Sequence, residues 1–107
     1  MITFLGAPPN FLKEPTSKSA IKGSQIIFEC QIDVSQPSYH WLKDGSNISK
    51  GSTSPSGSLS KLSVSNLEFS DAGNYSCVAM DKKTGQRGER TGVLAVKGML
   101  NNTSTTC

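Results

Sequence analysis

Residues 71–77 read DAGNYSC, and this stretch carries the strongest fold signal in the chain. Tyr75, Cys77 and Ala79 share one parity of an alternating pattern. Alternation with a period of two is typical of a β-strand with one buried face, so the tyrosine and the cysteine are expected to point inward together. Gly73 permits a tight bend before this strand, and the Tyr75 hydroxyl is expected to satisfy backbone groups in the bend.

Cys30 belongs to a second strand with the same alternation. It shares its inward parity with three hydrophobic residues: Ile26, Phe28 and Ile32. Because Cys30 and Cys77 both face inward on their strands, the two side chains can meet. The one tryptophan of the chain, Trp41, lies between them on a third short strand, which ends at the turn dipeptide Asp44-Gly45.

Other short apolar runs follow the same pattern. They are Leu62, Val64 and Leu67 before the second cysteine, and Gly92, Leu94 and Val96 after it. No segment keeps a helical apolar period over three turns, and residues 67–71 indicate a single helical turn at a corner between strands. Short strands at this density, separated by Gly, Pro, Ser, Asn and Asp, predict an all-β sandwich or barrel.

The spacing of these residues resembles the immunoglobulin superfamily, and its intermediate (I-set) branch in particular. Trp41 follows Cys30 by 11 residues, Cys77 follows Cys30 by 47, and Tyr75 stands two residues before Cys77. The resemblance covers residues 8–97 and implies a two-sheet Greek-key β-sandwich closed by a Cys30–Cys77 disulfide. The core signature that it implies is Trp41, Asp71, Gly73 and Tyr75.

The first strand of an I-set domain is divided between the two sheets. Here residues 8–11 are similar to its first half, Pro15 to the break, and residues 21–23 to the half that crosses to the opposite sheet. Tyr75 follows Trp41 by only 34 positions, which leaves little room for the extra hairpin of an antibody variable domain. The I-set branch is therefore favoured.

Members of the family often place a basic residue where it pairs with the aspartate that corresponds to Asp71. The serine-rich stretch from Gly51 to Ser60 departs from that pattern. Lys50 and Lys61 are the nearest candidates for the pair, and the sequence leaves both the ion pair and a strand in this stretch open.

Three segments resemble the N-terminal immunoglobulin domain of off-track-type receptors. They are FLKEP at 11–15, WLKDG at 41–45 and CVAMDKKTG at 77–85. These receptors are transmembrane proteins with an inactive tyrosine kinase domain that are implicated in Wnt and adhesion signalling. The resemblance implies a receptor ectodomain.

Composition argues against several other function classes. The chain has 107 residues and a net charge of +3, which is too weakly basic to predict nucleic-acid binding. Its longest apolar runs have three or four residues, so no direct membrane insertion is expected. One histidine, no C-x-x-C pair and no glycine-rich phosphate loop predict that the chain has no metal, no cofactor and no catalytic activity.

Two surfaces are candidate binding sites. The outward parity of the sheet that contains Trp41 and Cys77 is unusually apolar, with His40, Leu42, Val78, Met80 and Val93. Such patches often mark partner contacts, although a neighbouring domain or the first strand could instead cover it. A basic group near the last turn is a candidate site for a sulfated glycan or an acidic protein face: Lys82, Lys83, Arg87 and Arg90. The alternative for that group is a solvated hairpin.

The cellular compartment of the protein is inferred from the cysteines and from four Asn-x-Ser/Thr sequons. A disulfide persists outside the reducing cytosol, and the sequons are candidate glycosylation sites at Asn47, Asn74, Asn101 and Asn102. We therefore expect an extracellular or cell-surface recognition module of a receptor or adhesion protein, whose partner is another cell-surface or secreted protein or a second copy. The alternatives are an intracellular structural module of a muscle or cytoskeletal filament and a small stand-alone secreted protein.

The two ends of the chain fall outside the expected domain. Residues 1–7 are interpreted as an N-terminal leader segment that is too short, and lacks the basic head, for a secretory signal. Residues 98–107 lack alternation and are expected to form a flexible tail or linker. The odd cysteine, Cys107, lies in this tail, where an intermolecular bridge and an accident of where the chain was cut both remain open.

Overall fold

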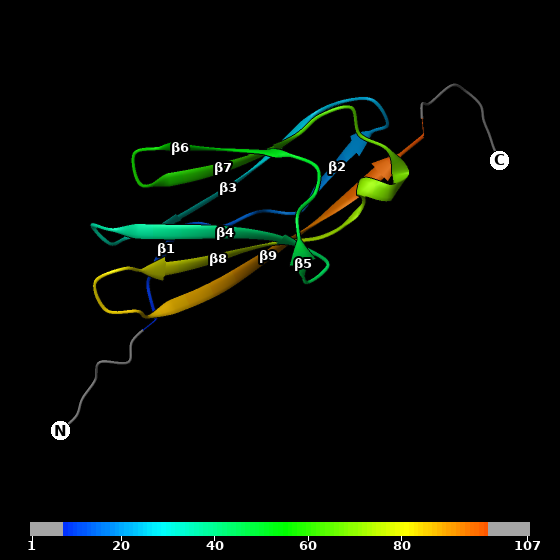
Figure 1. Ribbon diagram of the computed structural model, residues 1–107. Helices are drawn as coiled ribbons and strands as arrows, with labels where there is room; N and C mark the ends of the chain where they lie inside the picture. The colour runs from blue at the N-terminus through cyan, green and yellow to red at the C-terminus, as the bar shows by residue number, and fades with distance from the viewer. Residues whose placement is uncertain (1–7, 99–107) are drawn as a thin grey trace.

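The computed structural model describes residues 8–98, which form two β-sheets packed face to face (Figure 1). The four-stranded sheet runs in the order β1 (Phe11–Lys13), β3 (Ile26–Ile32), β7 (Leu59–Val64) and β6 (Ser52–Ser56). The five-stranded sheet runs in the order β2 (Lys18–Ile21), β9 (Arg87–Lys97), β8 (Gly73–Asp81), β4 (Pro37–Lys43) and β5 (Ser46–Asn47). The predicted all-β sandwich is confirmed.

The core lies between the sheets, where inward side chains alternate with outward ones. Along β3, Phe28, Cys30 and Ile32 are fully buried, whereas Ile27 is 41% exposed. Cys30 on β3 and Cys77 on β8 form a disulfide that links the two sheets. Two inward cysteines on facing strands therefore do meet, as their parity predicted.

The first strand is divided between the sheets, at the predicted break but with different limits. β1 begins at Phe11 because Pro8 and Pro9 have no backbone N–H to donate to a ladder. The chain crosses near Pro15, and β2 then runs parallel to β9 along Lys18–Ile21. The crossing needs Gly92 on β9, since a Cβ there would lie 2.5 Å from the Pro15 carbonyl oxygen.

A 3-10 turn, η1 (Phe69–Asp71), joins β7 to β8 at a corner of the sandwich. Here the Tyr75 hydroxyl donates a 2.6 Å hydrogen bond to the Asp71 carbonyl oxygen. Burial of the Tyr75 side chain, together with the nearby Asp71 and Asp44 carboxylates, raises the pKa of the phenol to about 12. The hydroxyl therefore keeps its proton and its bond across the physiological pH range. Within residues 8–98 no helix has the length and apolar character needed to cross a membrane.

The serine-rich stretch does form a strand, β6, which the sequence left open. It pairs antiparallel with β7 from the register Ser52–Ser63 to Ser56–Leu59. Ser52, Thr53 and Ser54 are all exposed, so this strand shows no apolar alternation, and β7 supplies the buried side chains on this side of the core.

Candidate functional site

The side of the five-stranded sheet that faces away from the four-stranded sheet is called the outward face here. The register places His40 opposite Val78 and Asn74 opposite Val93, and directly opposite residues of an antiparallel pair share a face. The face thus brings together the predicted set of His40, Leu42, Val78, Met80 and Val93. Val93 is 47% exposed, and Leu42, Val78 and Met80 are half-buried by their neighbours on the face.

The outward face consists of cross-strand rows. At one end of the face, called the upper end, Met80 lies between Ser38 and Arg87. At the other end, called the lower end, Asn74 lies beside Val93. Rows on one face are two residues apart along a strand, about 7 Å. The middle rows combine Leu42 and Val78 with polar side chains, among them Ser76 and Thr91. A mixture of apolar and polar side chains is the usual composition of a protein contact surface.

The predicted basic group is divided between two surfaces. Lys82 and Lys83 lie in the exposed turn after β8, and Arg87 is exposed beside them on the outward face. Arg90 lies three residues after Arg87, and because three is an odd number its side chain points to the other side of β9. There its guanidinium sits 4.3 Å from the centre of the Phe11 ring, and its Nε lies 3.4 Å from Glu14. Arg90 thus binds the first strand to the sheet.

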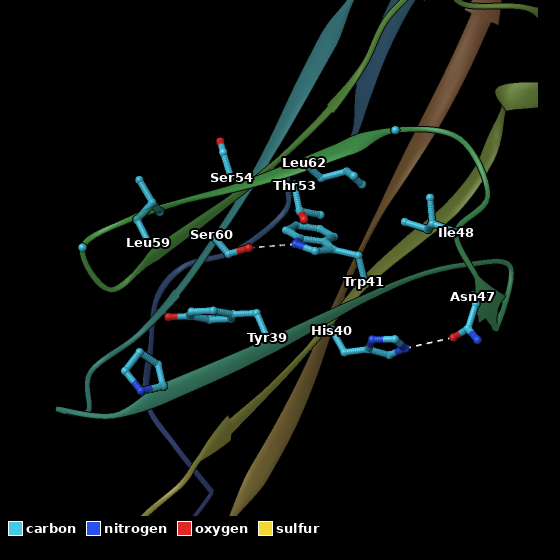
Figure 2. Close-up of a pocket in the computed structure, with 13 residues that line it drawn as sticks. Tyr39, His40, Trp41, Asn47, Ile48, Thr53, Ser54, Leu59, Ser60 and Leu62 are labelled. Carbon is cyan, nitrogen blue, oxygen red and sulfur yellow. Dashed lines mark hydrogen bonds between the residues drawn. The ribbon is translucent and has the colours of Figure 1, made fainter.

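Trp41 and Ser60 meet in the interior between the two sheets. The Trp41 indole nitrogen donates a 2.9 Å hydrogen bond to the Ser60 hydroxyl, and both residues are buried. A groove of about 550 Å³ lies beside this pair, between β4 and β6, and is rimmed by Tyr39, His40 and Asn47 (Figure 2). Tyr39 closes part of its wall, because its hydroxyl accepts from the Ile32 amide and donates to the Ser58 carbonyl oxygen.

His40 projects from β4 toward β5, where its Nε2 lies 2.9 Å from the Asn47 side-chain oxygen (Figure 2). Its partner is thus a neutral amide. Among the described residues no three His, Cys, Asp or Glu side chains gather in a way that could hold a metal ion.

Lys50 provides the basic partner of Asp71, and Lys61 does not. The Lys50 ammonium lies 2.7 Å from the Asp71 carboxylate, whereas Lys61 lies on β7 opposite Glu29. Burial alone raises the pKa of the Asp71 carboxyl, but hydrogen bonds from Lys50 and from the Glu68 amide outweigh burial and hold this pKa below its usual value of 3.8.

Replacing Lys50 by methionine is expected to lower the free energy of unfolding by about 1 kcal/mol at pH 7, since the ammonium is partly exposed and its attraction is screened. The folded-state pKa of Asp71 is depressed, so its contribution is complete above about pH 4 and is lost as pH falls through that pKa. Urea titrations should show the difference closing in acid. The matched control, Lys61→Met, should change stability by less than about 0.5 kcal/mol; a larger effect at Lys61 would contradict the assignment.

A second corner contact, between Asp44 and the start of β8, has no signal in the sequence. Asp44 and Gly45, with φ of 50° and 84°, form the two-residue turn between β4 and β5. The Asp44 carboxylate accepts a 2.9 Å hydrogen bond from the backbone N–H of Asn74. This bond, and a second one from the Lys43 ammonium, lower the pKa of the Asp44 carboxyl. Gly73 is required here, because its φ is 148° and a Cβ would lie 2.7 Å from that carboxylate.

The sequons at Asn47 and Asn74 lie on β5 and β8, and both asparagines are exposed. The candidate sites Asn101 and Asn102, the cysteine Cys107 and the expected leader at 1–7 lie outside the described residues.

Comparisons with known proteins agree with this geometry. A family model of the immunoglobulin domain matches residues 8–80. Peroxidasin homolog pxn-1 of Caenorhabditis elegans is 39% identical over 67% of the chain, and inactive tyrosine-protein kinase 7 of Homo sapiens is 32% identical over 71%. Neural cell adhesion molecule L1 of Homo sapiens is 37% identical over 61%. The chain spans only 6% to 7% of the length of these relatives.

Solved structures show the same architecture. The titin domains z1z2, crystallised in complex with telethonin, superpose with a TM-score of 0.77 at 26% identity, over 88% of this chain and 50% of that one. With two sheets, a disulfide between them, a buried tryptophan and a tyrosine hydrogen-bonded at the corner, the chain belongs to the immunoglobulin domain family.

Proposed function

We propose that this domain is a non-catalytic, extracellular protein-recognition module of a cell-surface receptor or adhesion protein. It contacts another cell-surface or secreted protein, or a second copy of itself, through the outward face. The observation that carries the proposal is the exposure of apolar side chains on this face, where Val93 is 47% exposed and Leu42, Val78 and Met80 are half-buried. Burying such a patch against a partner is favourable by roughly 25 cal/mol per Å².

The extracellular location is supported by the disulfide between Cys30 and Cys77, because such bonds are rare in the reducing cytosol. Two exposed sequons, at Asn47 and Asn74, fit the same compartment. We further propose that the domain is of the I-set type and that its parent is an off-track-type receptor. Similarity to an inactive tyrosine-protein kinase supports the second of these assignments.

An intracellular structural module of a muscle or cytoskeletal filament is the second candidate, and its support is the likeness to titin domains. A small stand-alone secreted protein is a third. Mass spectrometry with and without reductant, together with glycosidase treatment of protein from a secretory host, separates the two compartments. A free thiol pair with no glycan would favour the filament module and remove the extracellular proposal.

Charge substitutions on the two outer surfaces of the sandwich test the contact face. Met80→Asp or Val93→Asp, in protein made without glycans, is expected to weaken binding to a partner selected from a panel of ectodomains by about tenfold or more, since each change places a carboxylate in a desolvated contact. Ile27→Asp is the matched control, because Ile27 is 41% exposed on the opposite sheet. Equal losses from all three substitutions would place the contact elsewhere.

The basic group is proposed as a secondary surface for a sulfated glycan. It comprises Lys82, Lys83 and Arg87, since Arg90 is paired with Glu14 on the other side of β9. Chromatography on a heparin column tests this surface. The variant with both Lys82→Ala and Lys83→Ala should elute from the column at a lower salt concentration than the wild-type protein. We propose no contact with nucleic acid and no membrane insertion by this segment.

A further inference from the structure

Two asparagines lie together at the lower end of the outward face. Asn47 on β5 is opposite Leu42, and Asn74 on β8 is opposite Val93. Directly opposite residues have their Cβ atoms about 5 Å apart and point to the same side of a sheet. Both asparagine side chains are therefore neighbours of apolar residues of the outward face.

The side-chain amide of Asn47 is held in place with its nitrogen available. Its oxygen is hydrogen-bonded to His40 Nε2 at 2.9 Å, and Figure 2 shows the amide nitrogen turned away from His40. Ile48 packs against the core while Asn47 and Ser49 on either side of it are exposed. The acceptor and the hydroxyl of this sequon are thus both accessible in the folded domain.

Asn74 is fixed through its backbone and leaves its side chain exposed. Its N–H donates to the Asp44 carboxylate, and its carbonyl oxygen accepts from the Asp44 amide at 2.8 Å. The next two residues differ from those of the first sequon, because Tyr75 is 1% exposed and Ser76 is 6% exposed. The Ser76 hydroxyl is also paired with Thr91 at 2.8 Å. The enzyme that transfers a glycan to the Asn-x-Ser sequence can therefore reach the Ser76 hydroxyl only before β8 pairs with β4 and β9.

We propose that Asn47 and Asn74 carry N-linked glycans, and that these glycans cover the lower end of the outward face, including His40 and Leu42, while Met80 at the upper end stays uncovered. The inference rests on the proposed extracellular location. In the reaction, the asparagine Nδ2 attacks the anomeric carbon of a polyprenyl pyrophosphate-linked oligosaccharide. The N–C bond forms, the bond from that carbon to the phosphate oxygen breaks, the polyprenyl pyrophosphate leaves, and the amide loses one proton to a base.

The geometry of the rows explains why the two ends differ. Asn47 and Asn74 lie two and three rows below Met80, which corresponds to about 13 Å and about 20 Å along the strands. Glycans are bulky and strongly hydrated, so the apolar residues beside their attachment points cannot be desolvated by a protein partner. The upper row is the part of the face furthest from both attachment points.

The test uses the whole chain secreted from a glycosylating host, with Asn101→Gln and Asn102→Gln present so that only the two sites can contribute. Glycosidase treatment is expected to remove two glycans from this background, one each from the Asn47→Gln and Asn74→Gln variants, and none from the double variant. Ser49→Ala is the matched control at the first site, since it removes the sequon while keeping the hydrogen bond between Asn47 and His40.

Hydroxyl-radical footprinting then measures the coverage without needing a partner. Oxidation of His40 and Leu42 should rise about twofold or more when both glycans are absent, while oxidation of Met80 should stay unchanged. Absence of glycan at either site, or equal oxidation of His40 and Leu42 in both forms, would overturn the inference. So would protection of Met80 to the same degree. Because neither measurement involves a binding partner, the inference can fail while the proposed recognition function stands, and the reverse.

Discussion

Replacing Cys30 and Cys77 together by alanine is expected to lower the free energy of unfolding by about 4 kcal/mol. The disulfide closes a loop with a sequence separation of 47 residues, and the chain-entropy account gives this magnitude for a loop of that size. Breaking it restores conformational freedom to the unfolded chain and removes the disulfide that links β3 to β8 across the two sheets. Urea titrations of the wild-type protein and the double variant measure the difference.

The effect is large because small domains have stabilities of roughly 5–15 kcal/mol. Reduction of the wild-type protein should reproduce the loss, whereas Cys107→Ser should leave the urea midpoint unchanged if the buried pair alone is responsible. A midpoint that survives reduction would show that packing around Cys30 and Cys77 suffices without the bond. That result would also favour the intracellular filament candidate, because such a domain must fold with its thiols reduced.

Most of the fold could be predicted from the sequence because its central strands have one buried face. Phe28, Cys30 and Ile32 are all inside because alternate residues of a strand face the same way. The strand β6 escaped prediction for the opposite reason. An edge strand of serines has no buried side to produce alternation, and only its pairing with β7 identifies it.

The same parity argument predicted the outward face, but it was not applied to the basic residues. His40, Leu42 and Val78 were placed by alternation, and the register brings them together. The basic residues were instead grouped by closeness in the sequence. Arg87 and Arg90 differ by three positions, so strand geometry sends them to opposite sides of β9, and only Arg90 reaches Glu14.

The contacts that require Gly92 and Gly73 were beyond prediction. The Gly92 position is explained only by the Pro15 carbonyl oxygen, which passes where a Cβ would lie. Gly73 has a similar explanation in the Asp44 carboxylate. Neither glycine can be distinguished from an ordinary strand or turn glycine until the chain crossing and the corner are known. The sequence likewise offered two lysines for Asp71, and only the structure selects Lys50.

Phe28→Ala is expected to lower the free energy of unfolding by about 3–5 kcal/mol. Phe28 is fully buried, its ring is stacked 5.1 Å from that of Tyr75, and its centre is 6.5 Å from that of Trp41. Removing it leaves a cavity between two rings that are both fixed by hydrogen bonds, Tyr75 to Asp71 and Trp41 to Ser60. Because these bonds resist collapse of the cavity, the loss should fall toward the upper part of the range. Urea titration measures it.

The chain contains a matched control, since Phe69 is 56% exposed on η1. Phe69→Ala removes the same atoms, yet it leaves no buried cavity and is expected to cost less than about 1 kcal/mol. That remainder includes the contact of the Lys22 ammonium with the Phe69 ring, at 5.6 Å from its centre. Similar losses at both positions would mean that the core around Phe28 collapses freely. The hydrogen bonds of Tyr75 and Trp41 would then not hold the two rings apart.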